Sequence, residues 1–346
     1  MTKIDIKSMY LDELCDALFE MKEPKFRAGQ IFKWLQLGVS DFDEMTDIPL
    51  KLRQRLQECY YIVTANAKKI LESCIDDTVK YLYQLHDGEL VESVLMKYNH
   101  GYTICISTQV GCRMGCSFCA SGLNGLKRNL TASEMLAQIT ATQKDKGIRI
   151  SNVVLMGMGE PMDNLDNVIR FLKLVSHEKG LNIGLRHISV STSGVVPGIY
   201  KLLEENFPIT LSISLHAPND KIRSSMMRVN KSWNIDTLLK ACKDYINVTG
   251  RRISFEYAVV EGVNDSDANA KELAKRLKGM LCHVNLIPVN PVKENTYQKP
   301  DRNKIEHFCK LLNDLGLNTT IRRTLGSDID ASCGQLRGKA LEESNK

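Results

Sequence analysis

The segment "VGCRMGCSFCASG", Val110 to Gly122, places three cysteines at positions 112, 116 and 119. Their spacing is C-x3-C-x2-C, in a glycine-punctuated loop that directly follows the β-rich run "TICIST" (103–108). The chain has 11 cysteines, an odd number that cannot pair completely, and at 346 residues it is too large to need disulfide staples. We therefore expect reduced thiols, and a cluster of three indicates metal ligation.

Residue chemistry alone leaves three interpretations of Cys112, Cys116 and Cys119. The first is that they are buried, inert thiols. A structural zinc site is the second, but zinc needs four protein ligands, commonly in paired C-x-x-C units, and no histidine lies near these cysteines. The third is an iron–sulfur cubane, which takes one thiolate per iron. Three cysteines on a four-iron cluster would leave one iron open for a substrate or cofactor.

Short β-rich runs alternate with amphipathic helical stretches from about residue 102 onward. This alternation predicts an α/β fold with a parallel sheet and crossover helices, open or closed into a barrel. The count is about six units, fewer than the eight of a full barrel. The predicted strands are "TICIST" (103–108), "SNVVLMG" (151–157), "RHISVST" (186–192), "PITLSISLH" (208–216), "RISFEYAVV" (252–260), "CHVNLIPVN" (282–290) and "NTTIRRT" (318–324).

The first part of the chain differs, because apolar residues recur there at helical spacing. Helices are expected in "SMYLDELCDALFEM" (8–21), "KFRAGQIFKWLQLG" (25–38) and "PLKLRQRLQECYYI" (49–62). We expect residues 1–75 to form a small helical accessory domain that binds RNA through its basic residues. Residues 76–98 alternate around "HDG", which predicts a β-hairpin linking this domain to a core of residues 99–330. Residues 331–346 remain as a C-terminal tail.

Bulk properties bound the class of protein. The net charge of +5 and the pI of about 8.5 are compatible with a nucleic-acid partner, but equally with an ordinary mixed surface. No apolar run reaches the ~18 residues of a membrane span, and the N-terminus carries acids with no apolar signal core. We expect no membrane partner and a cytoplasmic location.

Polar and glycine-rich motifs follow the predicted strands. In parallel α/β sheets, chemistry gathers at the carboxyl ends of the strands, so these loops are expected to face one cavity. The five motifs are "GMGEPMDN" (157–164), "STSG" (191–194), "SLHAPND" (214–220), "VEGVND" (260–265) and "PVNP" (288–291).

A C-x3-C-x2-C loop after the first strand of such a fold resembles the signature of radical S-adenosylmethionine enzymes. "GMGEP" (157–161) resembles their glycine-rich cofactor motif. Further motifs extend the likeness over nearly the whole chain, which is similar to the RlmN/Cfr family of RNA methyltransferases. Those motifs are "GLKRNLTASE" (125–134), "STSG", "SLHAPND", "HVNLIPVNP" (283–291) and "DIDASCGQLRG" (328–338).

The resemblance implies a fold and two cofactors. The fold is a partial (β/α)6 barrel of the radical S-adenosylmethionine type with the helical N-terminal domain. Cys112, Cys116 and Cys119 would hold one 4Fe–4S cluster, whose open iron binds S-adenosylmethionine. The residues that the resemblance implies as contacts to S-adenosylmethionine are Gly159, Glu160, Ser191, Ser214, Leu215, His216 and Asn290. Without the resemblance, a single residue of these types at the end of a strand would more often be a turn or capping residue.

The resemblance also implies three catalytic residues. Cys333 would accept a methyl group from one S-adenosylmethionine, and a radical derived from a second would activate that methyl for transfer to RNA. Cys105 would take the proton from the target carbon and then form a disulfide with Cys333. Glu92 matches a proton acceptor of the family. On residues alone, the two cysteines would be ordinary buried thiols and Glu92 a solvated strand residue.

The implied substrates are an adenosine of 23S rRNA near the peptidyl transferase centre and the adenosine 3′ of the anticodon in tRNAs, methylated at carbon-2. The target base would leave its stack to enter the barrel. A flavodoxin-type protein would donate electrons to a monomeric enzyme. The basic pairs Lys127–Arg128, Arg251–Arg252 and Arg322–Arg323 could follow RNA phosphates, or simply be solvated.

Three alternatives stay open. A Cfr-type enzyme would methylate carbon-8 of the same rRNA adenosine, but our expectation for that pattern is "GEA" where this chain reads Gly159–Glu160–Pro161. A non-methylating radical enzyme would not need Cys105 and Cys333. A zinc-stapled RNA-binding module would be colourless, whereas an iron–sulfur protein is brown.

Overall fold

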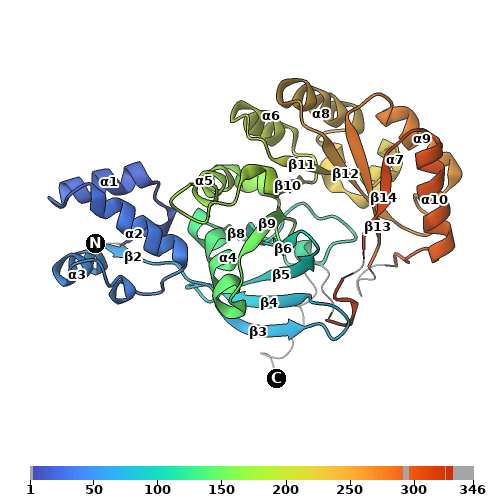
Figure 1. Ribbon diagram of the computed structural model, residues 1–346. Helices are drawn as coiled ribbons and strands as arrows, with labels where there is room; N and C mark the ends of the chain where they lie inside the picture. The colour runs from blue at the N-terminus through green and yellow to red at the C-terminus, as the bar shows by residue number, and fades with distance from the viewer. Residues whose placement is uncertain (1–2, 291–295, 324, 330–346) are drawn as a thin grey trace.

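The computed structural model describes residues 3–290, 296–323 and 325–329. Its central feature is a ten-stranded sheet in the order β14-β13-β12-β11-β10-β9-β6-β5-β4-β3 (Figure 1). From β6 to β14 every neighbouring pair is parallel. The parallel strands are β6 (Gly101–Cys105), β9 (Ile150–Leu155), β10 (Ile188–Thr192), β11 (Thr210–Ser214), β12 (Ile253–Val259), β13 (Cys282–Pro288) and β14 (Thr319–Ile321). All seven predicted strands are confirmed.

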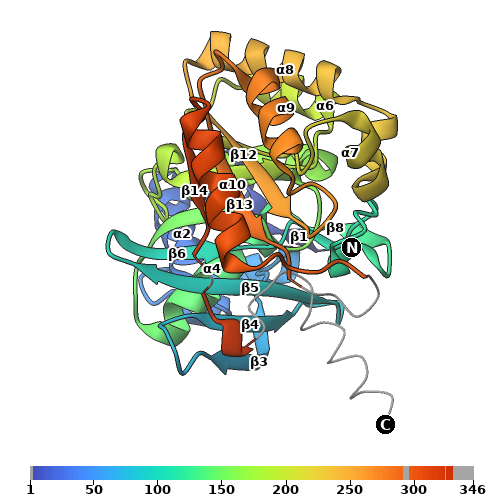
Figure 2. The same ribbon diagram turned by 90° about the vertical axis from the view of Figure 1, so that its right-hand side faces the viewer.

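A crossover helix follows each parallel strand except β14, which gives six strand–helix units within the described residues and confirms the expected partial barrel. Local signals set the helix ends. Thr131 and Glu134 form a capping box at α4, and Gly250 ends α8 in the left-handed conformation. Figure 2 shows α8, α9 and α10 outside the strands that they connect. The helices are α4 (Ala132–Lys146), α5 (Leu165–Val175), α6 (Val196–Glu204), α8 (Ile235–Thr249), α9 (Asp267–Leu277) and α10 (Arg302–Asp314), with a short α7 (Asp220–Met226) before α8.

The two faces of the parallel sheet carry different side chains. Strand register aligns Ser191 with Ser212, and Ser214 with Glu256, on one face. The alternate residues of these strands, such as Val190 and Ile213, are fully buried in the main hydrophobic core. Because side chains alternate between faces, the apolar set packs under the helices and the polar set lines the inside of the barrel.

Three antiparallel strands extend the sheet beyond β6. They are β3 (Asn66–Glu72), β4 (Val79–Gln84) and β5 (Leu90–Tyr98), with β5 paired to β6. The predicted hairpin around "HDG" is therefore present as β4 and β5, but it is part of the main sheet. The helical expectation is wrong for residues 66–72, where Lys68 and Lys69 lie in an exposed edge strand that favours charged side chains.

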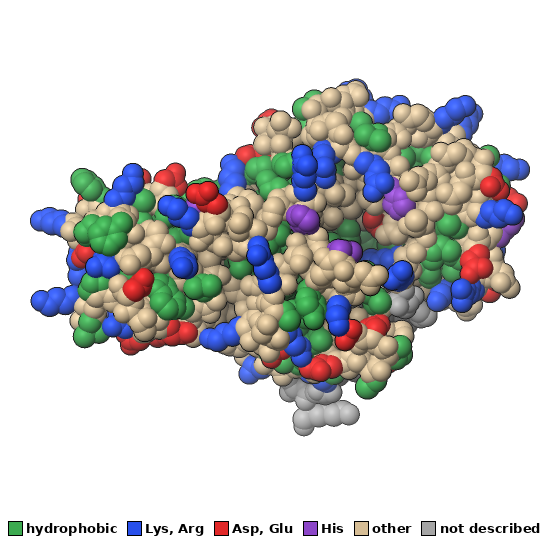
Figure 3. Space-filling view, in the orientation of Figure 1, with side chains coloured by type: hydrophobic (Ala, Val, Ile, Leu, Met, Phe, Trp, Pro, Cys, Tyr) green, Lys and Arg blue, Asp and Glu red, His purple; other side chains and the backbone are tan. Residues whose placement is uncertain are grey.

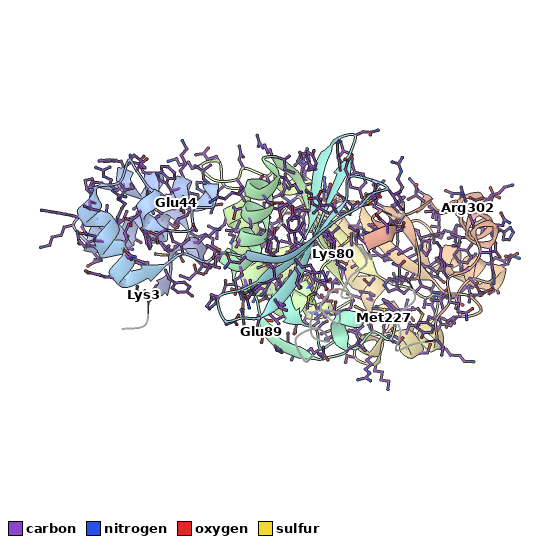
Figure 4. All side chains as sticks on the ribbon, turned by 90° about the horizontal axis from the view of Figure 1, so that it is seen from below. Lys3, Glu44, Lys80, Glu89, Met227 and Arg302 are labelled. Atoms are coloured by element: carbon purple, nitrogen blue, oxygen red, sulfur yellow. The ribbon has the colours of Figure 1, made fainter. Side chains whose placement is uncertain are left out.

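The N-terminal helices form a lobe beside α4 and α5 (Figures 1 and 4). The lobe contains α1 (Leu11–Glu20), α2 (Phe26–Leu37) and α3 (Leu50–Cys59), with short parallel strands β1 (Ile4–Asp5) and β2 (Tyr60–Tyr61). Polar contacts attach it to the barrel: Lys7 Nζ donates to Thr140 Oγ1 at 3.1 Å, and Arg170 pairs with Glu13 at 2.6 Å. None of the described helices is both long and apolar enough to cross a membrane.

Candidate active site

A cavity of about 330 Å³ lies inside the barrel and reaches the carboxyl ends of its parallel strands. Four of the five motifs expected there contribute to its wall; "VEGVND" does not. Its Asn264 is instead fully buried and braces the wall, bonding the backbone oxygens of His216 and Ala258, both at 2.7 Å. The predicted site residues that line the cavity are Cys112, Cys116, Cys119, Gly159, Glu160, Ser191, Ser214, His216 and Asn290.

The cysteine loop is an excursion between two short antiparallel strands, β7 (Gln109–Gly111) and β8 (Leu126–Asn129). The Cys112 N–H donates to the oxygen of Gly125 at 3.0 Å and closes the base of the loop. Gly111 has φ +78°, and a Cβ there would lie 2.0 Å from the same oxygen. Glycine is thus required at the start of the loop, because any side chain would open its base.

The three thiols share one environment. Burial raises the pKa of Cys112 to about 12, with a further contribution from the charge of Cys119. Burial also raises the pKa of Cys116, and the charges of Cys119 and Cys112 add to this effect. Burial therefore disfavours the thiolate form of Cys112 and Cys116, and a metal centre bound to these sulfurs would stabilise it.

The three thiols line the same cavity. Within the described ranges, no three His, Cys, Asp or Glu side chains stand close enough together to hold a single metal ion. A zinc ion needs its ligands gathered around one point, whereas each thiolate of a cubane binds a different iron. Both metal hypotheses therefore use the same three thiols as ligands.

Gln109 fastens the cysteine loop to the glycine-rich motif. Its side chain is fully buried and donates to Asn129 Oδ1 at 2.8 Å and to Asp163 Oδ2 at 3.0 Å. Its Oε1 accepts the N–H of Glu160 at 2.8 Å. Arg113, inside the cysteine loop, pairs with the other oxygen of Asp163. The cysteine loop and the glycine-rich motif are therefore bonded to each other through Gln109, Arg113 and Asp163, which were not predicted as site residues.

Glu160 presents a buried carboxylate to the cavity. One oxygen accepts the N–H of Ser193 at 2.7 Å, and the other accepts the N–H of Met162 at 3.1 Å. Burial raises the pKa of Glu160, and the hydrogen bonds from Ser193, Thr192 and Met162 oppose that rise. A carboxylate fixed in this way can accept further bonds from a cationic ligand.

Gly159 serves packing as much as ligand access. It has φ +108°, and a Cβ there would lie 2.7 Å from the Cβ of Gln109. A Cβ at Gly157 would lie 2.6 Å from the oxygen of Ile106. The sequence suggested that the small residue at position 159 lets the backbone approach a ligand. The structure shows that the missing side chain at position 159 leaves room for Gln109 of β7, the strand that leads into the cysteine loop.

His216 is neutral and held in an unusual backbone conformation, with φ +55°. Its Nδ1 accepts the N–H of Ala258 at 2.8 Å, so the ring carries its proton on Nε2. Burial lowers the pKa of His216 to about 3, with a smaller effect from the charge of Arg223. Phe118 of the cysteine loop meets the ring edge-on, at 4.8 Å between centroids. His216 therefore contacts the loop directly.

The predicted catalytic residues Cys105 and Glu92 lie on adjacent strands and point into the barrel. Cys105 pairs with Val94 of β5, and Val94 lines the cavity. Glu92 lies two residues before Val94, on the same face of β5. It is buried, and Lys80 Nζ lies 3.4 Å from its carboxylate (Lys80 is labelled in Figure 4). The alternative of a solvated Glu92 is therefore wrong, because the hairpin is a wall of the barrel.

Four predicted residues do not line the cavity. Cys105 and Glu92 are buried in the strands beside it and are not among its lining residues. Leu215 is buried in the hydrophobic core, and only its backbone is engaged near the site, through bonds to Arg223 and Glu256. Cys333 lies outside the described residues. Among the cysteines that are described, no two are joined by a disulfide.

The three basic pairs have different surroundings. Lys127 and Arg128 form ion pairs with Glu89, Asp87 and Glu134, so their charges are largely compensated. Arg251 and Arg252 precede β12, at the end of the barrel opposite the strand-end loops. Arg322 and Arg323 line the cavity and are exposed. On the face drawn in Figure 3, Lys and Arg side chains are spread over both lobes among acids.

Sequence reasoning also missed Arg223 and Glu256. Arg223 is fully buried and bonds the ends of two barrel strands, and Glu256 is a buried carboxylate in the cavity wall. Glu256 accepts hydrogen bonds from Ser254 and Asn285, both at 2.8 Å. The period-2 pattern of "RISFEYAVV" places Glu256 opposite the apolar face, and this signal could have identified it. Nothing local in the sequence marks Arg223.

Comparison with known proteins agrees with this geometry. Residues 106–276 match the model of the radical SAM superfamily, and residues 4–62 match the ribosomal RNA large subunit methyltransferase N-terminal domain. "Probable dual-specificity RNA methyltransferase RlmN" of Alkaliphilus oremlandii is 55% identical over 99% of this chain and 100% of its own length. The protein of the same name from Clostridium novyi is 53% identical over 96% of this chain and 97% of its own length.

A solved structure extends the agreement to three dimensions. The crystal structure of a radical SAM methyltransferase from Sphaerobacter thermophilus matches with a TM-score of 0.92 and 43% identity, covering 96% of this chain and 98% of that one. Enzymes of this superfamily use a 4Fe–4S cluster and S-adenosylmethionine, which the three thiols and the Glu160 carboxylate fit. The chain therefore belongs to the RlmN family of radical SAM RNA methyltransferases.

Proposed function

We propose that the protein methylates carbon-2 of an adenosine in RNA, with 23S rRNA and tRNA as substrates. The observation that carries the proposal is one barrel cavity that receives the three-cysteine loop, the buried Glu160 carboxylate and Val94, the strand partner of Cys105. The names of the relatives, which are dual-specificity RNA methyltransferases, support the choice of substrates.

The cofactor contacts follow from the wall of the cavity. Cys112, Cys116 and Cys119 hold the 4Fe–4S cluster. Glu160 accepts hydrogen bonds from the α-ammonium of S-adenosylmethionine, because its two oxygens are already fixed by backbone N–H groups. The other proposed contacts in the cavity wall are Gly159, Ser191, Ser214, His216 and Asn290. Leu215 does not line the cavity, and its N–H and carbonyl oxygen are both bonded within the protein.

When bound, the cofactors supply a methyl group and a carbon-centred radical. Cys333 carries the methyl group as a thioether and presents it to the flipped base. The methyl carbon, after loss of one hydrogen to the radical, would bond to carbon-2, and the adduct would give up one electron. Cys105 would take the proton from carbon-2 and then attack the sulfur of Cys333, so that the S–S bond forms as the carbon–sulfur bond breaks and the released carbon takes up a proton. An external thiol would reduce the disulfide before the next cycle. This route matches the chemistry of the target, because carbon-2 of adenine is electron-poor and does not attack a sulfonium methyl directly.

Glu92 is proposed as an additional proton acceptor. It shares the inner face of β5 with Val94, the strand partner of Cys105, so both groups serve the same side of the cavity. Lys80 Nζ, 3.4 Å away and fully buried, forms an ion pair with its carboxylate.

The remaining parts of the proposal concern partners. The target adenosine is extruded into the barrel, and Arg322 and Arg323 contact phosphates beside the cavity. The N-terminal lobe adds a second RNA contact. A flavodoxin-type protein supplies electrons, and the enzyme acts as a monomer in the cytoplasm. Carbon-8 methylation has no observation in its favour here, since "GEPMDN" and the names of the relatives both point to the dual-specificity enzymes.

Nucleoside mass spectrometry of RNA from a deletion strain tests the proposal. We expect 2-methyladenosine to disappear from both 23S rRNA and tRNA, and to return on complementation with the native gene but not with Cys333→Ala. Loss of 8-methyladenosine instead would move the assignment to the Cfr type. Unchanged methylation in either RNA would remove that RNA from the substrates.

A further inference from the structure

The short helix α7 connects the parts of the site that come from different strands. It lies between β11 and α8 in the chain, and the carbonyl oxygen of its last residue, Met226, accepts the N–H of Ser117 at 2.9 Å. Ser117 stands between Cys116 and Cys119 in the cysteine loop. Met227, the next residue, lines the cavity and is labelled in Figure 4 on the side away from the N-terminal lobe. The helix is therefore fixed to the metal loop itself.

Arg223 of α7 is fully buried and reaches the ends of two barrel strands. Its Nη2 donates to the oxygens of Ser193 at 2.6 Å and Ser214 at 3.1 Å, and its Nε donates to the oxygen of Leu215 at 3.1 Å. A fourth bond runs from Nη1 to Asn230 Oδ1 at 2.9 Å. Only the planar fork of a guanidinium can satisfy several carbonyls in fixed directions at once.

These carbonyls belong to the segments that contact the cofactor. Ser193 gives its N–H to Glu160, so Arg223 supports the residue that orients the carboxylate. Gly194 has φ +106°, and a Cβ there would lie 3.0 Å from Nη2 of Arg223. The "STSG" turn is thus shaped around the guanidinium, and Arg223 controls the position of the Glu160 carboxylate.

The charge of Arg223 has no carboxylate partner at ion-pair distance among the described residues; its four bonds go to neutral acceptors. A buried cation is costly unless something nearby compensates it. The cysteine loop is tied to the same helix, because Ser117, next to Cys116, donates its N–H to the oxygen of Met226 at 2.9 Å, three residues after Arg223. The natural compensation is negative charge on the cysteine loop.

We propose that Arg223 is a positioning residue with two roles: its fork fixes the "STSG" and "SLH" segments for S-adenosylmethionine, and its charge stabilises the anionic cluster on the neighbouring cysteines. Three thiolates give the cluster a net negative charge, and reduction by one electron adds another. A fixed positive charge close to it therefore favours the reduced state. The inference rests on the cofactors of the family and is independent of which RNA is methylated.

Two variants separate the roles. Arg223→Gln keeps amide N–H donors but removes the charge, whereas Arg223→Lys keeps the charge but removes the fork. Arg228→Gln is the matched control. Arg228 is exposed, and its side chain lies 3.2 Å from the Cβ position of Gly115 in the same loop, so solvent screens its charge. Each full-length protein is loaded with iron and sulfide without oxygen, then titrated with a reductant and followed by the electron paramagnetic resonance signal of the reduced cluster.

We expect Arg223→Gln to make the midpoint potential more negative, while Arg223→Lys and Arg228→Gln stay at the native value. Equilibrium dialysis should show S-adenosylmethionine bound about ten-fold more weakly by both Arg223 variants, because Ser193 and Glu160 lose their support. An unchanged potential in Arg223→Gln would overturn the charge role, and so would equal shifts in both Arg223 variants. Native cofactor affinity in both would overturn the positioning role.

Cluster loading itself is a further readout if the Gln variant is unstable. Iron uptake by Arg223→Lys but not by Arg223→Gln would support the requirement for charge. If neither variant takes up iron, Arg223 is a structural residue and the proposal fails. A failure of RNA methylation in otherwise loaded proteins would bear on the proposed function and not on this inference.

Discussion

Replacing Glu160 by glutamine tests the cofactor site most sharply. Both carboxylate oxygens already accept backbone N–H groups, at 2.7 Å from Ser193 and 3.1 Å from Met162. Glutamine removes the negative charge and turns its own NH2 group toward one of these donors. The loss of a charge-assisted hydrogen bond costs about 1.5–3 kcal/mol, which corresponds to roughly 10- to 150-fold weaker binding of S-adenosylmethionine.

Equilibrium dialysis of the cluster-loaded protein with labelled S-adenosylmethionine measures this effect. Thermal unfolding without cofactor, measured in parallel, separates lost binding from lost folding. Glu256→Gln is the matched control, because Glu256 is also a buried carboxylate of the cavity wall with two hydrogen-bond donors. Native affinity in Glu160→Gln would refute the assignment. Equal weakening in both variants would show that the cavity needs only negative charge, and not a specific contact with Glu160.

Three further predictions follow from the same geometry. Gly159→Ala should lower the free energy of unfolding by roughly 2–4 kcal/mol in urea titrations, because the residue has φ +108° and its Cβ would strike Gln109; a loss below 1 kcal/mol would contradict the packing. Burial lowers the pKa of His216 to about 3, so the unfolded state binds the proton more tightly between about pH 6.5 and 3, and the free energy of unfolding falls as the pH falls. Between about pH 7 and 5 the native protein should lose about 2 kcal/mol more of its unfolding free energy than His216→Asn, because asparagine tolerates φ +55° but does not titrate. Equal losses in the two proteins would refute this prediction. Replacing Arg322 and Arg323 together by alanine should weaken RNA binding and reduce the slope of log K against log salt concentration by about two, because both arginines line the cavity. Lys127→Ala should leave this slope unchanged, because Lys127 is already paired with Glu89. Equal effects in the two proteins would contradict the proposed RNA contact of Arg322 and Arg323.

Much of the barrel could be predicted because its signals are local. Each parallel strand after β6 is a short apolar run that follows a helix, and helix caps such as Thr131 and Gly250 can be predicted from their neighbours in the sequence. The edge strand over residues 66–72 was missed because its side chains are mostly exposed, so it lacks the apolar alternation that identifies buried strands. Its partner strand, not its own sequence, determines its structure.

The candidate site likewise contains residues that could be predicted from the sequence and residues that could not. The cysteines and Glu160 carry visible chemistry at regular spacing, and the sequence places them at strand ends. Residue chemistry alone favours a solvated Glu92, and only the pairing of β5 with β6 brings it to the side of Cys105. Arg223 could not be predicted, because its role depends on carbonyl groups from two other loops, and backbone acceptors leave no trace in side-chain patterns.

The measurement that bears most directly on this account is spectroscopy of the protein purified without oxygen. If Cys112, Cys116 and Cys119 hold three irons of a cubane, the preparation contains four irons and four sulfides per chain, estimated from the cluster type. Addition of S-adenosylmethionine then changes the electron paramagnetic resonance signal of the reduced cluster, because the ligand binds the open iron. A colourless protein that contains zinc, or a cluster whose signal S-adenosylmethionine leaves unchanged, would contradict it.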